Sequence, residues 1–173
     1  MRTSLLTTLM VIACAAAPAS AAARAPSEPK AVVQGFLDTV RTGRDPDAVA
    51  RYFAPQVLAH QITSEGETTV VRTPKDYAAH VREFLATYGQ FSFEVADMIA
   101  QGDRVFVWWR QHGHHVGTVG GEHPTGAPLA SIAAAIYQVS GGRITEYWIL
   151  EDRKGLDLQL QQLAEQAPGP THP

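Results

Sequence analysis

The spacing of apolar residues changes once along this chain, near residue 91, and this change restricts the fold more than any other feature. Before residue 91, apolar side chains recur every three or four residues, which is typical of amphipathic helices. One such series is Val32, Val33, Phe36, Leu37 and Val40. From residue 91 onward, apolar and polar residues alternate, which is typical of half-buried β-strands. The first half is therefore predicted to be mainly helical and the second half mainly sheet.

Start and stop signals divide the first half into three short helices. Each start combines a residue that commonly caps a helix with a proline in the first turn. The three starts are Ser27-Glu28-Pro29, Asp45-Pro46 and Thr73-Pro74. The first helix is expected to end near Gly43 and the third at Gly89, because glycine favours the backbone conformation that terminates a helix.

Four strands of the second half are expected to form a meander. They cover residues 91–95, 104–115, 129–139 and 143–151. Glycine-containing turns at 101–103 and 140–142 allow neighbouring strands to run antiparallel. A weak early strand at 57–60 and a last helix at 156–166 complete the predicted elements.

A long, curved antiparallel sheet must cover one face with helices or leave a large apolar surface in water. The sequence therefore predicts an α+β fold, a cone-shaped barrel in which three N-terminal helices pack on a curved mixed or antiparallel sheet. The mouth of a cone is a natural pocket for a small apolar or aromatic molecule.

One folded domain is expected at residues 27–166. Residues 1–23 have the features of a signal peptide, with Arg2 before an apolar run and small residues after it. The protein is therefore expected to be secreted or periplasmic. Cys14 follows Val11-Ile12-Ala13, which also resembles a lipobox, so lipid anchoring through Cys14 is the alternative. The proline-rich residues 167–173 are expected to form a disordered tail.

Composition excludes several classes of function. The formal net charge is −3 and no lysine or arginine cluster is present, so a nucleic-acid partner is not expected. The apolar leader is too short for a stable membrane span. Cys14 is the only cysteine, so signal cleavage would leave no thiol for disulfides, zinc or nucleophilic catalysis. Neither a glycine-rich phosphate loop nor a Gly-x-Ser-x-Gly motif is present.

Local strings in the second half resemble those of a known family. They are Met98–Val105, Trp109, Gly113–Gly117, Pro124-Thr125-Gly126, and Gly142–Trp148 with Asp152 and Gly155-Leu156. In order and spacing they resemble the SnoaL-like polyketide cyclases of the nuclear transport factor 2-like superfamily, over residues 30–163. The resemblance implies the cone fold and a ring closure by aldol chemistry with an Asp as acid/base and no cofactor. Trp108, His114 and His123 stand where the family usually has Arg, Thr and Pro, so the pocket is expected to differ.

Asp152 matches the carboxylate position of this family and is expected to be the catalytic acid/base. Strand alternation places Ile144, Glu146, Trp148, Leu150 and Asp152 on one face. A carboxyl group at the end of an aromatic row would be partly desolvated, which raises its pKa toward the range useful for removing a proton beside a carbonyl. The alternative is that Asp152 caps the last helix or pairs with Arg153 or Lys154.

The remaining candidate site residues are polar or aromatic groups predicted to face the cone. His115 and Trp109 share the strand parity of Val105 and Val107, so both are expected inside, with His115 as a second acid/base or hydrogen-bond donor. His60 is expected to bind a substrate carbonyl, although a satisfied structural histidine is the alternative. Further lining side chains are expected to be Trp148, Phe36, Phe53 and Tyr137, which could equally belong to the core.

Two other functions and one assembly stay open at this point. The chain could bind an apolar ligand without catalysis. His112, His114 and His123 could instead bind zinc or copper, because His112 and His114 share one face of a strand, although no carboxylate or cysteine partner is evident. A homodimer is conceivable through the outer sheet face, where Phe106, Trp108 and Arg110 lie.

Overall fold

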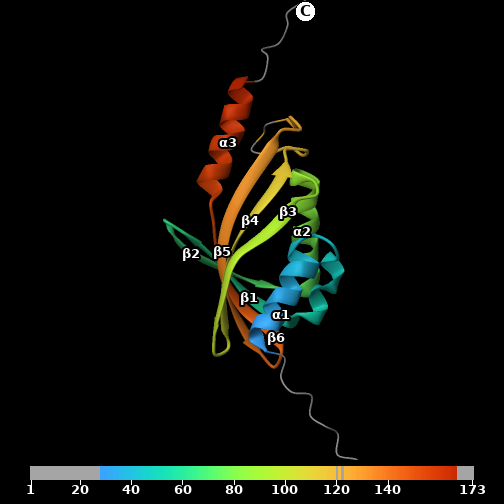
Figure 1. Cartoon of the computed structure of the whole chain (residues 1–173), viewed down its shortest axis with the longest axis vertical. Helices are drawn as coiled ribbons and strands as arrows, with labels where there is room; N and C mark the ends of the chain where they lie inside the picture. The colour runs from blue at the N-terminus through green and yellow to red at the C-terminus, as the bar shows by residue number, and fades with distance from the viewer. Residues whose placement is uncertain (1–27, 120, 122, 167–173) are drawn as a thin grey trace, which may run out of the picture.

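The computed structural model describes residues 28–119, 121 and 123–166, which form one mixed sheet with helices on one side and a last helix beside it (Figure 1). The proposed signal peptide, Cys14 and the tail at 167–173 lie outside the described residues. None of the helices within the described ranges is long and apolar enough to cross a membrane. The α+β class and the mixed sheet are confirmed.

The helical segments of the first half begin at the expected residues. They are α1 (Pro29–Phe36), the π-helical turn η1 (Leu37–Arg41), the 3₁₀-helix η2 (Pro46–Arg51) and α2 (Pro74–Tyr88). The α2 start is a capping box, because Thr73 accepts from the backbone of Asp76 while the Asp76 side chain accepts from the backbone of Thr73. Asp45 caps η2 by accepting from the backbone N–H of Ala48.

The sheet contains six strands in the order β2-β1-β6-β5-β4-β3. Its strands are β1 (Phe53–Thr63), β2 (Gly66–Arg72), β3 (Ser92–Gln101), β4 (Arg104–His114), β5 (Pro128–Ser140) and β6 (Arg143–Glu151). The β3–β6 meander is antiparallel as predicted, and β1 pairs with β6 in parallel. The expected strand at 57–60 is longer than predicted and forms a hairpin with β2, which the sequence did not reveal.

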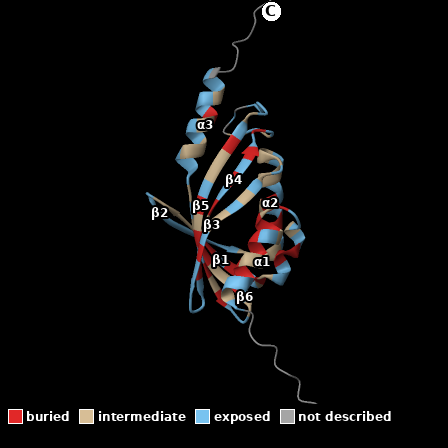
Figure 2. Cartoon of the chain, in the orientation of Figure 1, coloured by how far each residue is buried: buried red, intermediate tan, exposed pale blue. Residues whose placement is uncertain are grey.

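The two faces of the sheet have different surroundings. Side chains on the inner face pack against α1, η1, η2 and α2, and buried residues gather between these helices and the sheet (Figure 2). Val105, Val107 and Trp109 point inward from β4, while Phe106 and Arg110 point outward. The predicted parity of β4 is therefore confirmed.

The parity of β6 differs from the prediction because a β-bulge lies near its start. Val139 of β5 pairs with Ile144, but the adjacent Gln138 pairs with Glu146, so Thr145 is an extra residue. Such an insertion moves all later side chains to the opposite face. Tyr147 accordingly shares the buried inner face with Ile144, and Trp148 lies on the outer face.

Helix α3 (Arg153–Gln166) covers a part of β5 that has no β6 neighbour. Pairing of β5 with β6 ends at Ala133 and Glu151. Beyond this point the Gln159 side chain takes the place of a strand, because its Oε1 accepts from the N–H of Ala130 at 2.9 Å and its Nε2 donates to the carbonyl of Ala130 at 2.8 Å. The helix thereby satisfies backbone groups that would otherwise be open.

Candidate functional site

Strand pairing places inner-face side chains of neighbouring strands opposite one another, in rows across the sheet that are here called levels. Tyr137, Tyr147 and Ala59 share one level, and Ala135, Ile149 and Gln61 share the next. A third level contains Trp109, Ala133 and Glu151. Because two of the β5 positions are alanines, side chains of neighbouring elements have room over the centre of the sheet.

A pocket of about 420 Å³ opens on this face beside β1, β2 and β6. Apolar lining side chains include Ala59, Val70 and Ile149, and polar ones include Gln61, Thr68, Arg72 and Tyr147. Pairing of Val57 with Arg72 and of Gln61 with Thr68 brings the side chains of β1 and β2 to the same face. A volume of this size lies in the range of small-molecule sites.

Arg41 and Glu151 form an ion pair on the inner face. The distance between Arg41 Nη2 and Glu151 Oε1 is 3.8 Å, and the side chains are 4% and 30% exposed. The Arg41 guanidinium also lies 5.5 Å from the ring centroids of both Phe84 and Trp109. A buried guanidinium is thus held by two rings and one carboxylate, and that carboxylate remains accessible from outside.

Three tyrosines and one histidine surround these charged groups. Ring centroids of Tyr77 and Tyr147 are 6.3 Å apart, and those of Tyr137 and Tyr147 are 5.8 Å apart. Burial raises the pKa of all three hydroxyls, so they stay protonated and can donate hydrogen bonds. Burial, together with positive charge from Arg41 and Arg72, lowers the pKa of His80 to about 4, so this imidazole is neutral near pH 7.

Four side-chain nitrogen atoms are buried without a hydrogen-bond partner among the described residues, two of them in residues that line this pocket. They are Arg41 Nη1, Gln61 Nε2 and Arg72 Nε on the inner face, and also His115 Nε2. Burying a polar group without a partner costs free energy. Unpaired donors at a pocket are therefore available for a ligand that accepts hydrogen bonds.

A family comparison decides how this architecture is classified. The model of the SnoaL-like polyketide cyclases matches residues 31–160, which is three quarters of the chain. The chain belongs to the SnoaL-like polyketide cyclase family. No curated protein matches it.

Solved structures share the SnoaL-like fold at low sequence identity. A candidate polyketide cyclase from Acidithiobacillus ferrooxidans is 24% identical, with a TM-score of 0.68 over 79% of this chain and 96% of that one. IdmH from Streptomyces antibioticus, also a candidate polyketide cyclase, is 22% identical, with a TM-score of 0.66 over 78% and 99%. A Catenulispora acidiphila protein with a ketosteroid isomerase-like fold is 18% identical, with a TM-score of 0.60 over 79% and 97%. That structure contains trimethylamine.

The structure does not place Asp152 inside the SnoaL-like fold, contrary to our expectation. Asp152 is exposed, and its Oδ1 accepts from the backbone N–H of Gly155 at 2.8 Å, so it caps α3. The expectation was wrong because the bulge at Thr145 reverses the parity of β6. The neighbouring Glu151 therefore faces inward in its place.

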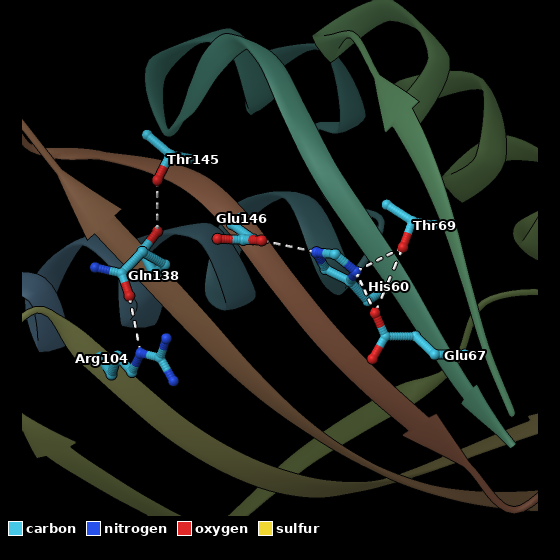
Figure 3. A network of polar contacts seen from close by, with 7 residues as sticks. All are labelled: His60, Glu67, Thr69, Arg104, Gln138, Thr145 and Glu146. Carbon is cyan, nitrogen blue, oxygen red and sulfur yellow. Dashed lines mark hydrogen bonds and ion pairs between the residues drawn. The ribbon is translucent and has the colours of Figure 1, made fainter.

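His60 and Trp148 also lie on the outer face of the sheet. Figure 3 shows His60 with its polar partners on this face. His60 Nδ1 is 2.8 Å from both Glu67 Oε1 and Thr69 Oγ1, and His60 Nε2 is 2.8 Å from Glu146 Oε1. Its ring stacks on Trp148 at 4.9 Å between centroids. His60 is thus a satisfied histidine that joins β2 to β6 across β1, which was the alternative interpretation.

His115 and Trp109 are buried on the inner side as predicted, but they are far from each other. His115 follows β4 and lies about 20 Å beyond Trp109, since a strand rises about 3.3 Å per residue. Its Nδ1 contacts Thr125 Oγ1 at 3.3 Å, and its backbone pairs with Ala127 and Gly126. Trp109 donates to Gln111 Oε1 at 3.1 Å. His115 therefore anchors the loop before β5 and does not approach Glu151.

Phe36, Phe53 and Tyr137 do come together, as part of the core. The Phe36 ring lies 5.1 Å from that of Phe53 and 5.7 Å from that of Tyr137, and all three side chains are buried. The core alternative holds for Phe36 and Phe53, while Tyr137 also contacts the tyrosine group beside the pocket.

The histidine cluster has no metal-binding geometry in the part of the chain that the structure describes. His112, His114 and His123 are exposed. Across residues 28–119, 121 and 123–166, no group of three or more His, Cys, Asp and Glu side chains could hold a metal ion.

The inward-facing polar residues Arg41, Gln61, Arg72 and Glu151 were missed by sequence reasoning. Arg41 did carry a signal, because it follows Leu37 by four residues and so continues the apolar face of its helix. The other three could not be placed, because their orientation depends on the unpredicted β1–β2 hairpin and on the bulge in β6.

Proposed function

We propose that this protein binds a small organic molecule in the pocket beside β1, β2 and β6 and catalyses a cofactor-independent proton transfer next to a carbonyl group. This step is what a cyclase or an isomerase of carbonyl compounds requires. The observation that carries the proposal is Glu151, which follows the pocket-lining Ile149 on the same face of β6 and lies 4.0 Å from the pocket-lining Arg153. Its carboxylate is held by Arg41 at 3.8 Å yet is 30% exposed. Family membership supports the same reaction class.

In this proposal Glu151 is the acid/base group and the tyrosines act as hydrogen-bond donors. Glu151 accepts a proton from the carbon beside the substrate carbonyl, which leaves an enolate. It returns the proton to another carbon of the enolate in an isomerisation, or to the new alkoxide oxygen in an aldol ring closure. Tyr147 lies on the same face of β6, with Ile149 between them. Its hydroxyl stays protonated because burial raises its pKa, and it donates to the oxygen on which negative charge develops. Arg41 holds the Glu151 carboxylate in place.

Hydrogen exchange into a simple ketone tests this assignment. The probe is 2-tetralone, and NMR in D₂O measures how fast its α-hydrogens are replaced by deuterium. Glu151→Gln is expected to reduce the protein-dependent rate to that of buffer, because an amide cannot accept the proton. Asp152→Asn is the matched control and is expected to retain the rate, since asparagine also caps a helix.

Equal exchange rates for Glu151→Gln and the wild-type protein would refute Glu151 as the base. Loss of exchange in Asp152→Asn with retention in Glu151→Gln would restore the assignment to Asp152. Binding of 2-tetralone with no exchange in the wild-type protein would instead support a ligand-binding module without catalysis.

We further propose that the outer sheet face binds a second copy of the chain. Phe106, Ile132, Ile136 and Leu150 are 36%, 43%, 37% and 54% exposed on this face. Phe106, Ile132 and Leu150 line an open hollow of about 900 Å³ beside the start of α3. Contiguous apolar surface of this kind marks interaction sites, and a two-fold dimer buries the same patch of both copies.

We also propose that the folded domain is exported by residues 1–23. Mass spectrometry of the protein recovered outside the cytoplasm of a bacterial host tests this proposal. A mature start between residues 21 and 25 is expected, and a start at Cys14 with added lipid mass would support anchoring instead.

A further inference from the structure

Two buried donors in the pocket have no protein partner. Arg72 Nε and Gln61 Nε2 are both buried and unpaired within the described part of the chain. Both side chains line the same pocket of about 420 Å³. Strand pairing directs them to the inner face, because Arg72 lies opposite Val57 and Thr68 lies opposite Gln61.

The charge of Arg72 is only weakly compensated, by the exposed Asp76 carboxylate, whose pKa it lowers. Among the described residues no carboxylate oxygen lies within 4.0 Å of its guanidinium. Arg72 lies close enough to Tyr77, His80 and Tyr147 for its positive charge to lower the pKa of each group. Since His80 is neutral near pH 7, it adds no charge to this region.

The charged residues that line the pocket are Arg72, Arg153 and Glu65. Arg153 and Glu65 are exposed, and Arg153 lies 4.0 Å from Glu151, so Arg72 is the partly buried charge of the pocket. The rest of the wall is mixed, with the apolar Ala59, Val70 and Ile149 beside the polar Gln61, Thr63 and Thr68. A suitable ligand therefore combines an apolar body with an anionic group.

We infer that the pocket recognises a carboxylate-bearing ligand, whose oxygens accept hydrogen bonds from Arg72 and Gln61. A carboxylate has two acceptor oxygens and matches a guanidinium N–H beside an amide N–H. A neutral ketone oxygen could accept hydrogen bonds but would leave the charge of Arg72 without a close counterion. The inference rests on the proposed function only for the location of the site, and it names the substrate class as an aromatic or alicyclic acid.

Calorimetric titration with 2-naphthoate and with the neutral isostere 2-naphthamide tests the inference. The wild-type protein is expected to bind 2-naphthoate at least about tenfold more tightly than the amide, since a charge-assisted hydrogen bond contributes more than a neutral one. Arg72→Gln is expected to remove this preference while its affinity for the amide is retained. Arg51→Gln, an exposed arginine outside the pocket, changes the net charge equally and is expected to behave like the wild-type protein.

Gln61→Glu provides a second variant that does not depend on removing Arg72. A carboxylate at this position repels an anionic ligand, so 2-naphthoate affinity is expected to fall at least about tenfold while 2-naphthamide still binds. Equal affinity of the wild-type protein for the acid and the amide, or no binding of the acid, would overturn the inference. So would an Arg72→Gln variant that keeps its preference for the acid.

The two proposals fail in different ways. Loss of acid preference with Glu151-dependent exchange of 2-tetralone intact would refute only the ligand class. Acid preference that depends on Arg72, with unchanged exchange in Glu151→Gln, would refute only the base.

Discussion

Replacement of Glu151 by glutamine should destabilise the protein through the buried guanidinium of Arg41. The pair is separated by 3.8 Å, and Arg41 is 4% exposed. At an effective dielectric constant of about 20, two charges at this distance attract by about 4 kcal/mol. Removing one partner of a fully buried pair costs about 3–5 kcal/mol, because the remaining charge is left uncompensated.

A smaller loss is expected here because Glu151 is 30% exposed and already partly solvated. We expect Glu151→Gln to lower the free energy of unfolding by about 2 kcal/mol, which corresponds to a drop in Tm of roughly 6–8 °C for a domain of this size. Arg41→Met keeps an unbranched apolar stem against Phe84 and Trp109 and removes the charge. When it is combined with Glu151→Gln, it should therefore recover at least about 1 kcal/mol.

Urea unfolding followed by circular dichroism gives the four free energies of this double-mutant cycle. A Glu151→Gln variant within about 0.5 kcal/mol of the wild-type protein would refute the reasoning. So would an Arg41→Met change that shifts stability equally in both backgrounds, since additivity means that the two side chains are not coupled.

Three further outcomes are expected. Asp152→Ala should lose about 1 kcal/mol of unfolding free energy in urea, whereas Asp152→Asn should lose little, because only alanine removes the helix cap; equal losses would contradict the capping role. His80 has its pKa lowered from 6.5 to about 4 by burial, so the unfolded chain binds more protons between these values and stability falls as pH drops through this window. His80→Asn should reduce the difference in unfolding free energy between pH 7.5 and pH 5 by about 1.5 kcal/mol, and an unchanged difference would show that another group titrates. Phe106→Glu should convert a dimer into a monomer in sedimentation velocity, and a wild-type monomer at high concentration would refute the proposed interface.

Local sequence signals predicted much of the fold. The meander followed from strict alternation and two glycine turns, and the starts of η2 and α2 followed from Asp45-Pro46 and Thr73-Pro74. These signals act within a few residues, so they can be recognised without a structure. The β1–β2 hairpin was missed because β2 is mostly exposed and has no apolar alternation.

The candidate site was predicted less well because it depends on register. One extra residue, Thr145, exchanges the faces of Trp148 and Tyr147, and nothing in the local composition marks it as a bulge. Because of this exchange, the carboxylate that faces inward belongs to Glu151 and not, as expected, to Asp152. The pairing of β4 with β5 has no such interruption, and the inward position of Trp109 was predicted correctly. His115, just beyond β4, is buried.

The contact between Gln159 and Ala130 keeps the backbone groups at the end of β5 paired as long as the last helix is intact. If proteolysis removed α3, the end of β5 would present open amide and carbonyl groups beside the apolar side chain of Ile132. Such an end could recruit strands from other molecules and start aggregation. The last helix therefore protects this protein against self-templated assembly as well as completing its domain.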